Sequence, residues 1–146
     1  MTLLQTMDLA ASGMSAQRTR MNVAAMNLAN RSTTRTPEGG PYRRRDVVLE
    51  TVPMPGGFDA AMRGASGQAD AVGVKVSDIV VSQDEPKLVY DPGHPDADAA
   101  GYVAMPNVDS IREMVDLMGA ARAYEAGTSV LSTVRSMADQ ALRIGR

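Results

Sequence analysis

Apolar residues recur at intervals of seven near the beginning of the chain. A seven-residue period is typical of a helix that packs along one seam against another helix. It predicts a helix over about residues 3–29, in which Gln17 is a polar interruption of the seam. The seam consists of Met7, Met14, Met21 and Leu28, with Leu3, Ala10, Gln17 and Ala24 at the intervening positions.

The end of the chain shows a second, longer helical pattern, over about residues 108–144. Asn107 and Asp109 are both suitable N-cap residues. Glu113 follows near the start and Arg143 near the end, as the helix dipole favours. The apolar positions with helical spacing are Ile111, Met114, Val115, Met118, Ala121, Tyr124, Leu131, Val134, Ala138 and Leu142. Such a helix would be roughly 55 Å long, more than an isolated small domain needs.

The middle of the chain has a different character, because all eight prolines lie between Pro37 and Pro106. Short apolar runs separated by turn residues predict strands. They fall at 47–49, 74–76, 79–81, 87–90 and 102–103, and we expect 87–90 to form a hairpin with 79–81. The stretch from Pro53 to Gly73 has the composition of a flexible loop.

These patterns predict an α+β fold. Long N- and C-terminal helices pack as an antiparallel, coiled-coil-like pair, with a small β-containing segment between them. We expect two parts: a helical domain of residues 1–30 plus 107–146, and a central region of hairpins and loops over 31–106.

Composition narrows the classes of function. Among 146 residues there are four Tyr, one Phe and no Trp, which argues against a pocket lined by aromatic rings. A net charge of -2 gives no nucleic-acid footprint, and without cysteine there is no disulfide or thiolate metal site. No apolar run is long enough to span a membrane, and the N-terminus lacks the order of residues of a cleavable signal peptide.

The sequence offers few candidate catalytic or metal-binding residues. His94 is the single histidine and has Asp91, Asp96 and Asp98 nearby, but this set is a weak metal signal. A turn in which the Asp side chains accept bonds from local backbone N–H groups explains it better. No nucleophile elbow or phosphate-binding glycine motif occurs. We therefore assign no catalytic, cofactor-binding or metal site, and expect no enzyme activity and no cofactor.

Three features remain open to a role in binding. The basic run Arg43–Arg45 is either a solvated strand edge or an ion-pairing surface toward a neighbouring subunit. The methionine seam is better explained by helix packing than by a promiscuous peptide-binding face. Asn27 and Asn30 mark either a plain helix end or a junction where the chain turns sharply against another helix.

Several motifs resemble one family. The stretch Asn22 to Asn30, continued by Ser32 to Arg44, resembles the N-terminal signature of bacterial flagellar rod and hook proteins. Residues 90–98, 101–103 and 106–108 resemble the junction between the central and C-terminal parts of a rod protein. Glu113-Met114, residues 122–126 and the ending 141–146 resemble its C-terminal helix. One departure is visible, since Gly127 stands where the family usually has Asn.

The resemblance implies a structural subunit of the proximal rod in the flagellar basal body. This driveshaft crosses the periplasm, transmits motor torque and surrounds the export channel. The implied partners are copies of the chain itself, other proximal and distal rod subunits, the hook–basal-body complex protein FliE and the flagellar type III export apparatus. Export would proceed without a cleavable signal peptide, and neither nucleic-acid binding nor a membrane span is implied.

The residues expected to carry assembly all lie on the two helices. They are Met7, Met14, Met21, Leu28, Asn27, Asn30, Met114, Met118, Tyr124, Glu125, Leu131, Val134 and Leu142. The alternative is a soluble helical adaptor or export chaperone that binds clients through the methionine-rich helix face.

Overall fold

The computed structural model describes residues 3–53 and 72–144 and divides into two compact units. Unit 1 comprises Met1–Thr19, Leu49–Ser77 and Ala120–Arg146, and unit 2 comprises Arg20–Val48 and Asp78–Gly119. The described elements are α1 (Leu3–Ala29), β1 (Arg45–Pro53), β2 (Val72–Val81), β3 (Lys87–Tyr90), β4 (Tyr102–Met105) and α3 (Ser110–Ile144). Both helices contribute to both units, so each unit contains a part of the helix pair.

Both helices form where the apolar periodicity predicts them. The start of α3 is set by Asp109, whose Oδ1 accepts a hydrogen bond from the backbone N–H of Ile111 at 2.9 Å. This is the bond of an N-cap residue, which satisfies a donor that the first helical turn cannot pair internally. The helix therefore begins at Ser110, two residues after the predicted start.

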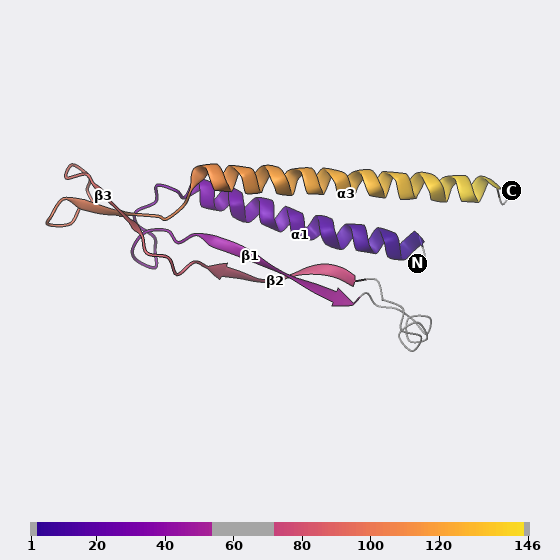
Figure 1. Cartoon of the computed structure of the whole chain (residues 1–146), viewed down its shortest axis with the longest axis horizontal. Coiled ribbons are helices and arrows are strands. Elements are labelled where there is room, and N and C mark those ends of the chain that lie inside the picture. The colour runs from indigo at the N-terminus through magenta and orange to yellow at the C-terminus, as the bar shows by residue number, and fades with distance from the viewer. Residues whose placement is uncertain (1–2, 54–71, 145–146) are drawn as a thin grey trace. The chain divides into compact units, whose positions relative to one another are not determined.

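The two helices run antiparallel, as Figure 1 shows. Within unit 2, Asn27 of α1 bonds to Glu113 of α3. Within unit 1, Met14 lies against Gly127, close enough that an added Cβ at Gly127 would come within 2.6 Å of the Met14 Cγ. Together with the central strands, this confirms the predicted α+β class with paired terminal helices.

Small residues form much of the buried helical surface. Ala16, Val23 and Ala24 of α1 and Ala120 of α3 are each no more than 5% exposed. Gly127 is a site of close helix approach, as its position facing Met14 demonstrates. Gly13 and Gly119, which could have served the same purpose, have no neighbouring atom within 4 Å of an added Cβ.

Part of the predicted apolar stripe on α3 faces away from α1. The residues that α3 turns inward follow the helical series Glu113, Leu117, Ala120, Tyr124, Gly127, Leu131 and Val134, all buried or half-buried. Ile111, Met114, Val115 and Met118 are instead 44–71% exposed. The first part of α3 thus presents an apolar surface that its own chain does not cover.

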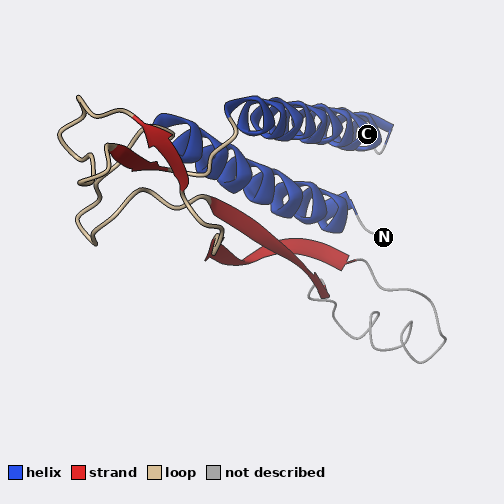
Figure 2. Ribbon diagram, turned by 60° about the vertical axis from the view of Figure 1, so that its left-hand side comes forward, coloured by secondary structure: helices blue, strands red, loops and turns tan. Residues whose placement is uncertain are grey.

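β1 and β2 form one two-stranded sheet, whose arrows in Figure 2 point in opposite directions. The backbone N–H of Ser82, just after β2, donates to the carbonyl of Arg44, just before β1, at 2.8 Å. β2 joins the two predicted segments at 74–76 and 79–81 into one strand. The predicted flexible loop overlaps the strands at Pro53, Val72 and Gly73, and its remaining residues 54–71 lie outside the described part.

The predicted hairpin between 79–81 and 87–90 is wrong. β3 pairs instead with β4, in an antiparallel register that places Tyr90 opposite Tyr102. Their rings meet edge to face at 5.3 Å. Gly101 closes this hairpin with a φ of +83°, and an added Cβ would lie 2.9 Å from the Tyr90 ring. A local turn with this glycine therefore places β4, rather than β2, beside β3.

The contact between Gly127 and Met14 predicts a difference between two glycine substitutions in α3. Gly119→Ala adds a methyl group in open space and should raise the free energy of unfolding by about 0.5–1 kcal/mol through helix propensity. Gly127→Ala gains the same propensity but overpacks against Met14, at a cost of about 1–3 kcal/mol. Urea unfolding of both variants should place Gly127→Ala below Gly119→Ala, and Met14→Ala should remove much of that difference. Equal stabilities would show that Met14 moves aside without cost.

Candidate functional site: a polar clasp in unit 2

The most elaborate set of side-chain contacts in the described residues surrounds Asn27, in the last turn of α1. Its side chain is only 1% exposed and makes four hydrogen bonds. The amide nitrogen donates to the Arg45 carbonyl at 2.8 Å and to Glu113 Oε2 at 2.9 Å. The amide oxygen accepts from the Arg45 backbone N–H at 3.0 Å and from the Tyr42 hydroxyl at 2.9 Å.

Two of these bonds imitate a neighbouring strand. Arg45 is the first residue of β1, and the Asn27 amide occupies both its N–H and its C=O. A carboxamide is the short side-chain group that offers a donor and an acceptor together. Asn27 therefore holds the beginning of β1 against the end of α1 and still has a donor bond for α3.

Glu113 is the second centre of the site. It is 1% exposed, and each carboxylate oxygen has a fixed donor. Oε2 accepts from Asn27, and Oε1 accepts from the Nε of Arg44 at 2.6 Å. Arg44 also pairs with Asp46 through Nη1 and lies 3.9 Å from Asp116 through Nη2. We call Asn27, Tyr42, Arg44 and Glu113 the polar clasp.

Electrostatics keep Arg44 and Tyr42 in the protonated forms that donate their hydrogen bonds. Burial by itself would lower the pKa of Arg44, but its hydrogen bonds to Glu113 and Asp46 outweigh that effect and raise it. Burial also raises the pKa of Tyr42, partly offset by the charge of Arg45, so the phenol keeps the proton that it donates to Asn27. Because a buried charge without a partner is costly, this mutual pairing is what makes burial of Glu113 tolerable.

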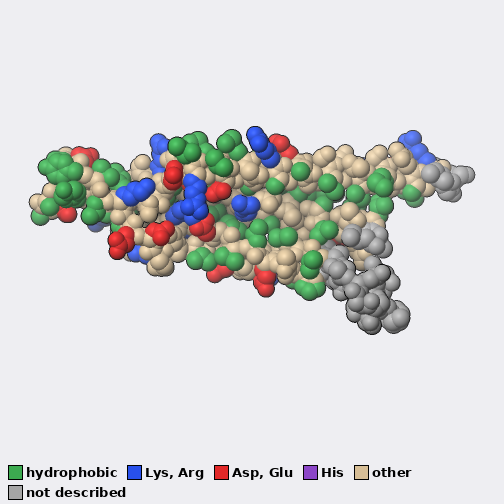
Figure 3. Space-filling view, viewed as in Figure 1, with side chains coloured by type: hydrophobic (Ala, Val, Ile, Leu, Met, Phe, Trp, Pro, Cys, Tyr) green, Lys and Arg blue, Asp and Glu red, His purple; other side chains and the backbone are tan. Residues whose placement is uncertain are grey.

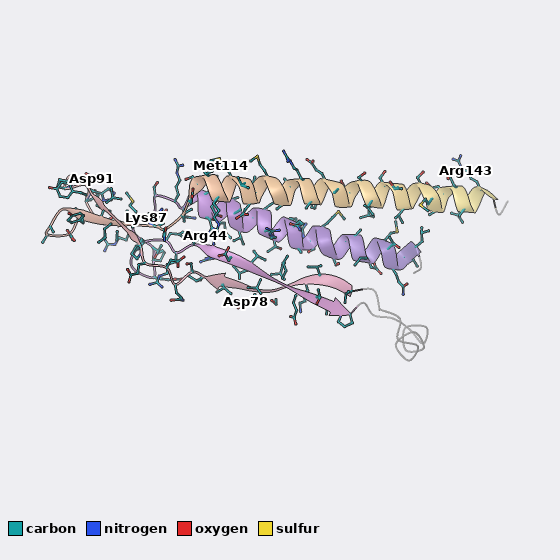
Figure 4. The ribbon with its side chains drawn as sticks, viewed as in Figure 1. Arg44, Asp78, Lys87, Asp91, Met114 and Arg143 are labelled. Carbon is teal, nitrogen blue, oxygen red and sulfur yellow. The ribbon has the colours of Figure 1, made fainter. Side chains whose placement is uncertain are left out.

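The arrangement is suited to joining segments rather than to chemistry on a substrate. Within the described residues, every buried side-chain nitrogen or oxygen has a hydrogen-bond partner. Figure 4 shows Arg44 beside the end of α1 and the start of α3. The polar clasp ties α1, β1 and α3 of unit 2 to one another, and its carboxylate is occupied on both oxygens.

The three arginines of the basic run Arg43–Arg45 make three different kinds of contact. Arg44 belongs to the polar clasp, so it is neither a solvated edge residue nor free to pair with a neighbouring subunit. Arg43 is exposed and donates to Gln83 at 3.4 Å. The Arg45 guanidinium lies 5.9 Å from the centre of the Tyr42 ring, within the range of a cation–π contact.

The His94 segment is a hydrogen-bonded turn. Asp91 Oδ1 accepts from Gly93 N, Asp98 Oδ1 accepts from Ala100 N and Tyr102 N, and His94 Nδ1 accepts from Asp96 N. The expectation that the carboxylates bond to the local backbone is confirmed for Asp91 and Asp98, whereas the Asp96 carboxylate accepts from the Thr34 hydroxyl instead. Over residues 3–53 and 72–144, no group of three or more His, Asp or Glu side chains is placed to hold a metal ion.

The remaining residues expected to carry assembly fall into two sets. Met7, Met14, Met21, Leu28, Tyr124 and Leu131 are half-buried, and Val134 is buried. Met114, Met118, Glu125 and Leu142 are exposed. Asn30 is half-buried and caps the end of α1, where its side chain donates to the Met26 carbonyl at 2.9 Å.

Sequence reasoning missed Glu113 and Arg44 as partners. Glu113 was explained by the dipole of the helix start, and Arg44 was hidden inside a basic run. A signal for Glu113 does exist, because it heads a seven-residue series with Ala120, Gly127 and Val134. That series follows the inward face of α3. Nothing in the sequence pattern separates Arg44 from Arg43 and Arg45.

Comparisons with known proteins match both helical ends. Residues 7–35 match the family described as "Flagella basal body rod protein", and residues 99–144 match "Flagellar basal body rod FlgEFG protein C-terminal". The flagellar basal-body rod protein FlgC of Escherichia coli O6:H1 is 47% identical over 146 residues, covering all of both chains. FlgC of Salmonella typhimurium is also 47% identical, and FlgC of Bacillus subtilis is 41% identical over 152 residues, again over the full length of both chains.

Matches at both ends, on a pair of long terminal helices, define the class as flagellar basal-body rod proteins. Within that class, sequence identity to FlgC over the whole length of both chains identifies the family. The chain belongs to the family of the flagellar basal-body rod protein FlgC. None of the helices in the described ranges is both long enough and apolar enough to cross a membrane.

The two asparagines at the end of α1 provide a matched test of the polar clasp. Asn27→Asp replaces the donor that faces Glu113 with a second carboxylate, and should lower the free energy of unfolding by about 2–5 kcal/mol. Asn30→Asp changes a less buried cap and should cost about 1 kcal/mol or less. Urea titration, with hydrogen exchange to follow unit 2, measures both. Equal costs would contradict the assignment of Asn27 as a central residue.

A double-mutant cycle tests the pair of Glu113 and Arg44. Either single change to Ala removes the buried ion pair and leaves the remaining charge only its weaker contacts, and should cost about 3–5 kcal/mol. The double variant should cost less than the two together, with a coupling of about 1–3 kcal/mol. Glu125→Ala, at an exposed position of the same helix, is the control and should change stability by no more than about 0.5 kcal/mol. Additive effects would mean that the two side chains do not act as a pair.

Proposed function

We propose that this chain is a structural subunit of the flagellar basal-body rod and that it acts through assembly rather than catalysis. The observation that carries the proposal is full-length identity of 47% to FlgC proteins, in a fold whose helices match two rod families. The polar clasp supports it, because its groups are used to join segments of the chain. The alternative of an adaptor or export chaperone has no support from the comparisons.

The finer assignment is to the proximal rod, where the chain would polymerise with other rod proteins into the driveshaft. We place it in the part of the rod that crosses the periplasm and surrounds the export channel. Its proposed partners are copies of itself, the other rod subunits and FliE. Delivery would use the flagellar type III apparatus without a cleavable signal peptide. Family membership supports each of these assignments.

Within the rod, we assign residues 1–30 and 107–146 to the inner helical layer and residues 31–106 to the outer part. The exposed apolar residues on α3 support this assignment. Ile111, Val115 and Met118 recur at helical spacing and are 51–71% exposed in the single chain. An uncovered apolar stripe on a helix is stabilised when another helix covers it. The neighbouring subunits of a rod would supply that cover.

Met118 offers a test that separates assembly from folding, since it is 51% exposed and contributes little to its own chain. Met118→Asp should leave the stability of the free chain within about 0.5 kcal/mol. In the rod it would place a charge in an apolar contact, at a cost of several kcal/mol, so rods should lose the subunit and cells should lose motility. Ser136→Asp introduces the same charge at an exposed polar position of α3 and is the control.

The measurement is the amount of this chain in basal bodies purified from its own bacterium after replacement of the chromosomal gene. Swimming in soft agar is the second readout. Normal incorporation of the Met118→Asp chain would show that the exposed apolar stripe of α3 does not lie in a contact between subunits. Absence of the unsubstituted chain from purified basal bodies would overturn the proposed function itself.

A further inference from the structure

One face of the β3–β4 hairpin is apolar and uncovered. In an antiparallel pair, opposite residues point to the same side of the sheet. Val89 and Val103 therefore share one face, and Val103 on that face is completely buried. On the other face Leu88 is 68% exposed, Tyr90 64% and Tyr102 43%. Two of the five aromatic residues of the chain thus lie on an open surface, and Figure 3 shows apolar side chains gathered over this hairpin.

The hairpin also carries a concentration of negative charge. The hairpin with its turn, residues 87–105, contains three acidic residues and one lysine, for a net charge of -2. Asp91 and Asp98 use Oδ1 for backbone N–H groups of the turn, which leaves Oδ2 available to a cation from outside the chain. Figure 4 shows Asp91 at the end of the hairpin remote from Arg44. Acidic groups next to exposed tyrosines are well suited to an arginine-rich partner surface.

A hollow of opposite character lies elsewhere in unit 2. Its volume is about 490 Å³, and its lining includes Arg35, Arg43 and Arg45. The rest of the wall includes Pro37, Pro41, Tyr42 and Val81. Glu38 is the one acidic residue of the lining, so the lining carries a net charge of +2. We call this feature the cationic hollow.

The arginines of the cationic hollow are largely unneutralised. Among the described residues, neither Arg43 nor Arg45 has a carboxylate within 4.0 Å. Arg35 is 83% exposed and has only a 4.0 Å contact with Asp96. Three guanidinium groups around one hollow repel one another, and a carboxylate placed between them would relieve that repulsion.

We propose that the acidic, tyrosine-bearing tip of the β3–β4 hairpin in one copy docks into the cationic hollow of the next copy. The carboxylates of Asp91 and Asp98 pair with the arginines, while Leu88 and Tyr90 cover the prolines and Val81. The inference rests on the proposed function, because it names a contact between assembled subunits. Charge complementarity, +2 in the lining of the hollow against -2 in the hairpin, identifies the occupant as a second copy of this chain.

The hairpin of the same chain does not fill its own hollow. Its turn is held by Asp96, which accepts a hydrogen bond from Thr34 at 2.8 Å, next to Arg35. The remaining acidic groups at the tip therefore serve another subunit. Because the contact joins two different surfaces, it is heterologous, and its repetition builds a ring or an open helical array rather than a closed dimer. That geometry suits a subunit of a filament.

Single-cysteine chains test the contact directly, since the natural sequence has no cysteine. Glu38→Cys marks the rim of the cationic hollow, and Ala100→Cys marks the hairpin tip; both positions are exposed. The two chains are produced together in the native bacterium, basal bodies are purified, and a mild oxidant is added. We expect a disulfide-linked dimer that contains one chain of each kind. Pairing Ser136→Cys on α3 with Ala100→Cys is the control and should give no such dimer.

Charge variants then test the chemistry. Asp91→Asn with Asp98→Asn keeps an acceptor oxygen for the turn but removes both charges, and should lower the cross-link yield about tenfold. Arg43→Glu in the Glu38→Cys chain should also lower the cross-link yield about tenfold. Arg43→Glu in the Glu38→Cys chain should regain most of the yield when the Ala100→Cys chain carries Asp91→Lys. Lys75→Glu, a reversal of charge outside the hollow, should leave the yield unchanged.

The outcomes separate this inference from the proposed function. If the chains are present in basal bodies but Glu38→Cys and Ala100→Cys give no mixed dimer, the docking contact is wrong and the rod assignment stands. A cross-link from Ala100→Cys to a different rod protein would equally overturn the second copy as occupant. If neither chain is found in basal bodies although the natural chain is, the substitutions block assembly. Cysteines at Pro37 and Ala99, both exposed, then repeat the measurement, and failure of both pairs overturns the proposal.

Discussion

The hydrogen bond between Asn27 and Glu113 is the interaction on which the arrangement of unit 2 depends. It joins residues 86 positions apart, and through Arg45 and Arg44 it also fixes the beginning of β1. Its value lies in specificity more than in net energy, since the cost of desolvating the buried Glu113 carboxylate offsets most of what its hydrogen bonds gain. A shift of α3 by one helical turn along α1 would leave Glu113 buried without its donors, at a cost of several kcal/mol. The polar clasp therefore selects a single register for the helices.

The apolar side chains buried between the helices are mostly small. Ala16, Val23, Ala24 and Ala120 let the helices approach closely but bury little area each. The larger apolar side chains point outward, on the first turns of α3 and on the β3–β4 hairpin. A single chain of this kind buries only part of its apolar surface. The proposed assembly would bury the rest, so that the same helices serve both the fold and the contacts between subunits.

Much of this fold follows from the sequence, and the exceptions have physical reasons. Apolar periodicity predicted α1 and α3 nearly to their ends, because helix formation depends on local spacing and caps. Strand pairing was wrong, because the partner of Lys87–Tyr90 was decided by the turn ending at Gly101. Asn27 was recognised as a candidate junction from its place at the helix end. Arg44 was missed because nothing in the pattern distinguishes it from Arg43 and Arg45. Glu113 was missed because its charge was attributed to the helix dipole rather than to its place in the inward seven-residue series.

The separation of Asn27 and Glu113 along the chain has a consequence for the time at which the molecule becomes ordered. α1 is complete by residue 29, yet Glu113, the acceptor for Asn27 on the partner helix, lies beyond residue 109. A chain that emerges from a narrow conduit, at either end, cannot close the polar clasp until more than half of it has passed through. Until then, the first helix to emerge lacks its partner helix. In the proposed export, the long intervening segment would delay closure of the polar clasp while the chain passes through.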